Sequence, residues 1–195
     1  MNEFHHFLRT RRSVRRFKPD PVPAPVVDRI LATTIHAPSA HNLQPWRFVT
    51  IQKKSNRQKL GEALTKKMRL DMRAEDSPQA EIDKRVLISN RRIDEAPLII
   101  LLCRDIAVIR KDEPEEVTMG VQSVAIAGLQ ILLAAHAEGL GGNWICWPLY
   151  AQDEARDSLE LPETWQPQTM IFLGYADETP TEVFRQSANE LLIMN

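Results

Sequence analysis

The stretch from Val117 to Ala137 limits the possible folds more than any other part of the chain, because its 21 residues include no Asp, Glu, Lys or Arg. That length approaches the length of a membrane span. Polar side chains interrupt the stretch at Thr118, Gln122, Ser123, Gln130 and His136. A helix that is apolar on nearly every side is also what the centre of a soluble fold requires, so we predict a buried central helix. A chain of 195 residues surrounds such a helix only in part, and a second copy is expected to cover the rest.

Composition limits the classes of partner and the compartment. The length predicts a single domain over residues 1–195. A formal net charge of −1 is too small for a nucleic-acid binder, and no nucleic-acid or membrane partner is expected. Cys103 and Cys146 lack the spacing of a disulfide framework or a zinc site, which suits a reducing compartment. The first residues include no apolar secretory segment, so a cytoplasmic protein is expected.

Hydrophobic periodicity and helix breakers predict helices and strands without strict alternation. Helices are expected at about residues 3–11, 25–37, 56–73, 80–92, 117–137 and 153–159. Strands are expected at residues 46–52, 98–103, 143–147 and 169–175. The continuous apolar run at 98–103 is typical of a central strand that is buried on both faces. This mixture predicts an α+β fold. The helix at 56–73 is strongly basic, which fits either a solvated surface or a lid that attracts anions.

A basic segment near the start of the chain is a candidate anion site. Six of the ten residues from Arg9 to Lys18 are cationic, none is acidic, and Thr10 and Ser13 add hydroxyl groups. Guanidinium groups present pairs of donors that match phosphate oxygens, so the excess of arginine over lysine favours a fixed phosphoryl group. The alternative is a solvated basic helix end.

A second segment, residues 37–48 (APSAHNLQPWRF), combines loop-forming prolines with side-chain amides. Asn42 and Gln44 each offer a donor and an acceptor, which suits the edge of a flavin pyrimidine ring. The alternative interpretation is ordinary turn chemistry.

A third segment, residues 139–144 (GLGGNW), follows the long apolar helix. It is not a dinucleotide-binding fingerprint, because Trp144 replaces the third glycine and the segment follows a helix instead of a strand. Glycines still allow close approach of backbone N–H groups to a flat ligand. A simple glycine stop at the end of the helix is the alternative.

Four segments in this order resemble the FMN-dependent nitroreductase family: RRSVRRF, APSAHNLQPWRF, DEAPLIILLC and GLGGNW. The resemblance runs nearly end to end. It implies a nitroreductase-like fold, in which helices flank a central, mostly antiparallel sheet and the long buried helix lies at a dimer interface. Residues 159–177 are most similar to small bacterial members and to the reductase domain associated with deazaflavin coenzyme biosynthesis.

The resemblance also implies roles for the basic residues. Arg11, Arg12 and Ser13 match the positions that hold the FMN phosphate, ribityl chain and pyrimidine edge. Arg15 matches the cation on the N1/O2 side of the flavin, where it stabilises the negative charge of the reduced ring. Arg185 lies where family members often place a second phosphate ligand, although its surroundings, TEVFRQS, depart from the usual doubled basic pattern.

Other positions match parts of the site that close over the flavin ring. The loop that the partner subunit contributes is matched by Pro38, Ser39, Asn42 and Gln44. Gly141 and Gly142 match a turn whose backbone N–H approaches the flavin N5. A homodimer with a flavin site at its subunit interface is therefore expected.

The chain shows no convincing nucleophile and no metal-ligand spacing, so the chemistry is expected to belong to the cofactor. The expected reaction is ping-pong hydride transfer from NAD(P)H through FMN to an electron-poor acceptor, such as a nitroaromatic or a quinone. Three alternatives stay open: a deazaflavin-precursor reductase, a benzimidazole synthase that fragments its own reduced flavin, and a non-catalytic flavin-binding module.

Overall fold

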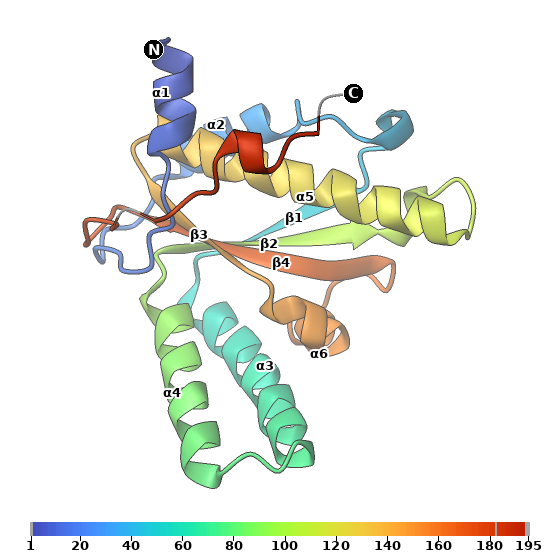
Figure 1. Ribbon diagram of the computed structural model, residues 1–195. Helices are drawn as coiled ribbons and strands as arrows, with labels where there is room; N and C mark the ends of the chain where they lie inside the picture. Colours follow the sequence, from blue (N-terminus) through green and yellow to red (C-terminus); the bar gives the residue numbers. More distant parts are fainter. Residues whose placement is uncertain (1, 182, 194–195) are drawn as a thin grey trace.

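The computed structural model describes residues 2–181 and 183–193, which fold around one four-stranded sheet (Figure 1). The strands are β1 (Trp46–Ile51), β2 (Leu98–Asp105), β3 (Gly141–Ile145) and β4 (Trp165–Gly174). Their order is β1-β2-β4-β3, and each neighbouring pair is antiparallel. The α+β class and the antiparallel sheet are confirmed, and β3 is left as an edge strand.

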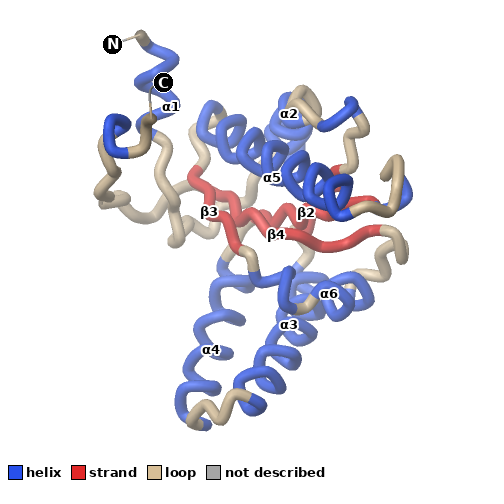
Figure 2. The backbone as a smooth tube through the Cα atoms, turned by 45° about the vertical axis from the view of Figure 1, so that its right-hand side comes forward, coloured by secondary structure: helices blue, strands red, loops and turns tan. Residues whose placement is uncertain are grey.

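The described residues form six α-helices, most of which pack on the two faces of this sheet. They are α1 (Glu3–Thr10), α2 (Ala24–Thr34), α3 (Lys54–Ala74), α4 (Gln79–Glu95), α5 (Pro114–Ala137) and α6 (Gln152–Ser158). Figures 1 and 2 show α5 and α2 on one face and α3, α4 and α6 on the other, with α3 and α4 projecting as a hairpin. Short 3-10 turns occur at Ala40–Asn42, Ile106–Val108, Trp147–Tyr150 and Ala188–Glu190.

The central strand β2 is buried along its whole length, as predicted. Side chains alternate along a strand, so Ile100 and Leu102 join the core beneath α5, while Ile99 and Leu101 join the core on the α3 side. Burial of one such side chain contributes about 1.5–3 kcal/mol. The two half-cores therefore fix the register of β2 between β1 and β4, since a slip by one residue would exchange them.

Helix α5 lies along the sheet and begins at Pro114, three residues before the uncharged stretch. Proline suits a first helical turn, and the acidic Glu115 and Glu116 favour the helix amino end. The helix approaches β3 so closely that a Cβ atom on Gly128 would lie 2.2 Å from the ring of Trp144. The buried central helix is therefore confirmed on its sheet-facing side.

The outer side of α5 is exposed and apolar at Val121, Ile126 and Leu129. In the described part of the chain, α5 is the one helix whose length and composition would allow a membrane span. Its packing against the sheet also fits the core helix of a globular fold. Cover by a second copy of the chain stays a prediction.

Candidate functional site

The basic segment after α1 lies along the open edge of β3. Ser13 forms a parallel bridge with Gly142, and the N–H of Val14 donates to the Gly142 carbonyl at 3.0 Å. A few residues later, Phe17 forms an antiparallel bridge with Ala176. The fold thus brings two of the segments singled out in the sequence, RRSVRRF and GLGGNW, side by side.

A cavity of about 400 Å³, which we call the arginine cavity, opens beside β3 where these two segments meet. Its walls include Arg11, Arg12, Leu132, His136, Gly141 and Gly142. No Asp or Glu is among the described residues that line it. The cavity is therefore suited to an anion, and it sits at the carboxyl-terminal end of α5.

Arg11 is the electrostatic centre of this cavity. Its pKa is lowered, first by burial and then by the charges of Arg12 and Arg185. Arg185 therefore lies within electrostatic reach of Arg11, although 174 positions separate them in the sequence. Bringing like charges together costs free energy, which a bound phosphate would recover through charge-assisted hydrogen bonds. Two of the predicted phosphate positions, Arg11 and Arg12, thus line one cavity, and Arg185 lies near enough to act on Arg11.

Arg12 also has a structural role. Its Nη1 donates to the carbonyl oxygens of Arg9 and Arg11, the latter at 2.9 Å, and so satisfies carbonyl groups at the end of α1. This orientation fixes the exit of the chain from α1. The backbone of Ser13 is held by its bridge to β3. The guanidinium of Arg11, in contrast, has no hydrogen-bond or ion-pair partner in the described chain.

Arg15 lies outside the cavity, and its side chain is exposed. Its position is set through the backbone, because Glu178 accepts hydrogen bonds from the backbone N–H groups of Arg15 and Arg16. The same carboxylate pairs with the Arg16 guanidinium at 3.2 Å, and these contacts lower the pKa of Glu178, the Arg15 N–H contributing most. The guanidinium of Arg15 has no fixed partner among residues 2–181 and 183–193. It is available to a ligand.

Gly141 and Gly142 differ from the expected turn, because both lie in strand β3. The glycine with a positive φ is Gly139, at 75°, which ends α5. A Cβ atom on Gly141 would lie 2.6 Å from Val14, and one on Gly142 would lie 2.7 Å from Leu132. The two glycines therefore let the basic segment and α5 approach β3. This close approach explains why they lie in a strand and not in the predicted turn. Their contact with a flavin N5 stays a prediction.

The loop carrying Pro38, Ser39, Asn42 and Gln44 lies at the other end of α5. Pro38 and Ser39 share a small cavity with residues of the amino-terminal half of that helix, Ser123 among them. Ser123 and His136 are about 20 Å apart along the helix axis at 1.5 Å per residue. Within one chain, this loop therefore does not meet the arginine cavity. The structure brings the predicted residues together as two groups, one at each end of α5.

This loop is held in an unusual backbone conformation. His41, Asn42 and Gln44 have positive φ angles of 50°, 54° and 50°. Left-handed conformations of non-glycine residues are costly and occur often at functional sites. Hydrogen bonds hold the loop in place: the Gln44 N–H donates to the Ser39 hydroxyl at 3.0 Å, and the Ala40 N–H donates to the Ser123 hydroxyl at 3.2 Å.

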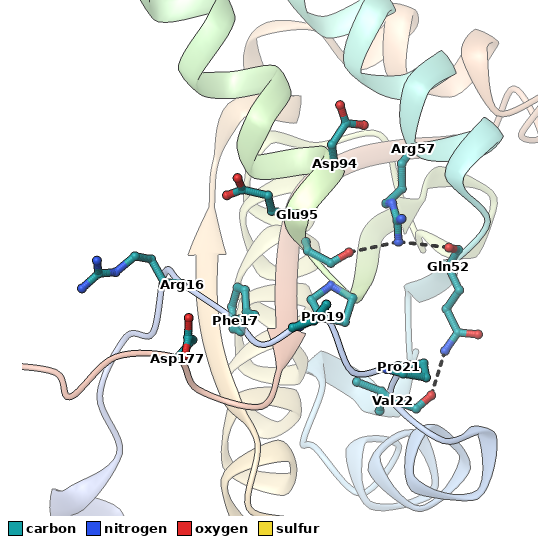
Figure 3. A pocket seen from close by; sticks show the side chains of 12 residues that line it. Arg16, Phe17, Pro19, Pro21, Val22, Gln52, Arg57, Asp94, Glu95 and Asp177 are labelled. Carbon is teal, nitrogen blue, oxygen red and sulfur yellow. Dashed lines mark hydrogen bonds between the residues drawn. The ribbon is translucent and has the colours of Figure 1, made fainter.

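A larger cavity, of about 700 Å³, lies on the other side of the basic segment (Figure 3). Asp94, Glu95 and Asp177 border it. Arg57 is fastened there through its Nη1 to the carbonyl oxygens of Gln52 (3.0 Å) and Ala96 (3.1 Å). The three carboxylates disfavour a phosphate, so the smaller cavity beside β3 is the better anion site despite its size.

Two other kinds of chemistry find no support in the described residues. For metal chemistry, the described residues include no group of three or more His, Cys, Asp or Glu placed to hold a metal ion. Burial raises the pKa of the Cys103 thiol to about 12, so that this cysteine stays protonated and unreactive.

The sequence reasoning missed His136 as a member of the arginine cavity. Its imidazole ring packs on Phe7 with ring centroids 4.8 Å apart, and its Nε2 lies 3.2 Å from the Thr10 hydroxyl. The available signal was its position in the last turn of the helix that leads directly into GLGG.

Comparison with known proteins agrees with this fold. Residues 8–175 match the family model described as the nitroreductase family. A Methanothermobacter thermautotrophicus protein with the provisional name NADH dehydrogenase/NAD(P)H nitroreductase is 30% identical over 176 residues, covering 89% of this chain and 77% of that protein. A 5,6-dimethylbenzimidazole synthase of Rhodospirillum rubrum is 30% identical over 172 residues, covering 86% of this chain and 79% of the synthase.

Among solved structures, a nitroreductase-like protein of Desulfovibrio desulfuricans in complex with FMN superimposes with a TM-score of 0.77. It is 24% identical, and the match covers 100% of this chain and 98% of that one, which establishes the likeness of fold. Because the family match spans most of the sequence and the fold agrees with it, the chain belongs to the nitroreductase family.

Proposed function

We propose that this protein is an FMN-dependent oxidoreductase that acts as a homodimer. It takes hydride from NAD(P)H and passes it to an electron-poor acceptor, such as a nitroaromatic or a quinone. The observation that carries the proposal is the cavity beside β3, which Arg11 and Arg12 line without an opposing carboxylate among the described lining residues. Arg185 lies close enough to lower the pKa of Arg11. The names of similar proteins, one of them solved with FMN, support the proposal.

The cavity and the residues near it fit FMN. Arg11, Arg12 and Arg185 supply the donors and charge that a phosphate monoester requires. Gly141 and Gly142 line the cavity and place no side chains of their own in it. Ser13 adds a hydroxyl group for the ribityl chain or pyrimidine edge. When bound, FMN supplies hydride transfer through its N5 atom, and the protein supplies position and electric field.

Arg15 has a different task from the phosphate cluster. Its exposed guanidinium is free of fixed partners in the described chain, while Glu178 holds its backbone. A cation that faces the N1/O2 side of the flavin stabilises charge that develops only on reduction, which favours the reduced state. Arg15 is therefore proposed to tune the reaction, and Arg11 to retain the cofactor.

A second copy of the chain completes the site in this proposal. Antiparallel pairing of two α5 helices through their exposed apolar sides places the amino-terminal half of one helix beside the carboxyl-terminal half of the other. The loop at residues 38–44 of one subunit then lies toward the arginine cavity of its partner. Its amides, Asn42 and Gln44, are already held in a strained conformation.

The test of the function is whether the purified protein retains FMN and whether NAD(P)H reduces it. We expect a yellow protein whose visible flavin absorbance bleaches on anaerobic mixing with NADH or NADPH and returns when a quinone is added. A protein that retains FMN but bleaches with neither reductant would contradict the oxidoreductase proposal and favour a non-catalytic flavin-binding module.

The identity to a 5,6-dimethylbenzimidazole synthase favours a second candidate function. That enzyme class differs from the first proposal in the fate of the reduced flavin, which it fragments, whereas a deazaflavin-precursor reductase differs in the acceptor of the hydride. If neither nicotinamide reduces the bound flavin, while externally reduced FMN and oxygen yield a benzimidazole, the second candidate replaces the first. Product analysis by mass spectrometry separates the two.

A further inference from the structure

We propose that His136 is a further phosphate-binding residue of this site, and that its imidazole takes up a proton when FMN binds. This inference rests on the proposed function. His136 lines the same cavity as Arg11 and Arg12, and it lies in the last turn of α5, directly before the glycine segment.

The hydrogen bonds around the ring identify the nitrogen that can gain the proton. The Thr10 hydroxyl donates its hydrogen to the Phe7 carbonyl at 3.0 Å. Its oxygen must therefore accept from His136, whose Nε2 lies 3.2 Å away. In the neutral ring, Nε2 then carries the hydrogen and Nδ1 carries the lone pair. Nδ1 is consequently the atom that becomes protonated, and the bond to Thr10 persists in both states.

In the free protein the surroundings favour the neutral ring. Burial lowers the pKa of His136, the charge of Arg11 lowers it further, and the Phe7 carbonyl partly opposes both. Arg12 lines the same cavity, and Arg12 and Arg185 both lower the pKa of Arg11. The nearby Glu138 is paired with Arg29 at 2.9 and 2.7 Å, and no carboxylate borders the cavity in the described chain.

A bound phosphate reverses this field. A phosphate monoester carries a charge of about −1.5 to −2 near neutral pH. Placed among the arginines, it lies in the cavity that His136 lines, so it offsets the cationic repulsion and accepts a hydrogen bond from the imidazolium. Binding therefore raises the pKa of His136. Between the pKa of the free protein and that of the complex, FMN affinity falls as the pH rises, by at most about tenfold per pH unit for one linked proton.

The matched variant is His136→Gln. A glutamine side-chain amide keeps a donor for the Thr10 hydroxyl but cannot take up a proton. His5→Gln is the control, because His5 is an exposed histidine of α1 and does not line the cavity. Riboflavin is the control ligand, because it has the same ring system and no phosphate.

The experiment is calorimetric titration of FMN into the full-length protein, freed of flavin by dialysis, at about pH 7 in buffers of different ionisation enthalpy. The arginines favour ionisation of the phosphate itself, which releases protons equally in all variants. We therefore expect the wild-type protein and His5→Gln to take up more protons than His136→Gln, by an amount that approaches one. Riboflavin should show no such difference between variants.

A second measurement on the wild-type protein removes any dependence on the fold of the variant. Long-range nitrogen–proton spectra of the histidine rings should show His136 titrating at a higher pH with FMN than without it. Equal proton uptake in wild-type protein and His136→Gln, or an unmoved His136 titration, would overturn the inference while FMN binding stands. Absence of FMN binding in wild-type protein would overturn the proposed function as well.

Discussion

Arg11 and Arg15 are four residues apart, yet they meet different charges. Arg11 lines the cavity and would face the permanent charge of a phosphate, whereas Arg15 lies outside it. We expect Arg11→Ala to weaken FMN binding by about 1.5–3 kcal/mol, roughly 10–150-fold, with a smaller effect on the reduction rate of protein saturated with FMN. Flavin fluorescence titration and anaerobic stopped-flow absorbance measure the two quantities.

Arg15→Ala should show the opposite pattern. A cation that acts on charge formed during reduction affects the rate more than retention, so we expect hydride transfer to slow by about 10–100-fold with a modest change in FMN affinity. Arg16→Ala is the matched control, because Arg16 is a neighbouring cation paired with Glu178 and borders the other cavity. Equal losses of affinity and rate in both Arg11→Ala and Arg15→Ala would contradict the separate roles.

The glycines of the third segment also differ residue by residue. Gly142→Ala places a methyl group 2.7 Å from Leu132 and 2.9 Å from Leu173, so we expect a loss of about 1–3 kcal/mol in the free energy of unfolding. Gly139 meets nothing within 4 Å and only requires a positive φ. Asparagine tolerates that conformation, and Gly139→Asn should cost less than about 1 kcal/mol. Urea unfolding followed by circular dichroism measures the free energy of unfolding of both variants. Equal losses in the two variants would argue against close packing at Gly142.

At the scale of elements, the central strand and the long helix could be predicted, whereas the start of β3 could not. The apolar runs at 98–103 and 117–137 carry their own periodicity or length. Glycine has low strand propensity, so Gly141 and Gly142 resemble a turn in the sequence. They become strand residues because β4 pairs with them on one side and Ser13 bridges Gly142 on the other. Such pairing depends on residues far away in the chain.

The anchoring of the strained loop to α5 can be tested at this scale. The Ser123 hydroxyl accepts from the Ala40 N–H and donates to the Met119 carbonyl at 2.7 Å. Ser123→Ala removes the acceptor, so we expect amide hydrogen exchange at residues 39–44 to accelerate by about 3–10-fold, which corresponds to about 1 kcal/mol. Thr118→Ala is the control, because its hydroxyl bonds only within α5, to the Pro114 carbonyl. Unchanged exchange in Ser123→Ala would show that other contacts hold the loop.

At the scale of the whole molecule, the sequence predicted both halves of the candidate site but not the distance between them. Each half has a local signature, in RRSVRRF and in APSAHNLQPWRF. Their placement at opposite ends of α5 follows from how the helix lies on the sheet, which no local pattern encodes. His136 was missed for the same reason, since its surroundings in the cavity depend on where α1 packs.

The distance between the halves leads to a prediction about assembly. Leu129 and Ile126 are 50% and 40% exposed on the outer side of α5, where burial of each side chain in an interface would contribute about 1.5–3 kcal/mol. Leu129→Lys introduces a charge that must be desolvated in any helix pair at this face. We expect a monomer by light scattering, and FMN affinity lowered by at least about tenfold, because each site loses the other subunit's loop.

Leu87→Lys supplies the matched control for this variant. Leu87 is 71% exposed on α4, in the hairpin that projects from the sheet, so the same substitution there changes surface charge without touching α5. Leu87→Lys should leave both the molecular mass measured by light scattering and the FMN affinity as in the wild-type protein. If Leu129→Lys stays dimeric, another surface joins the subunits. If it becomes monomeric and keeps full affinity for FMN, the loop at 38–44 takes no part in holding the flavin, and one chain suffices for binding.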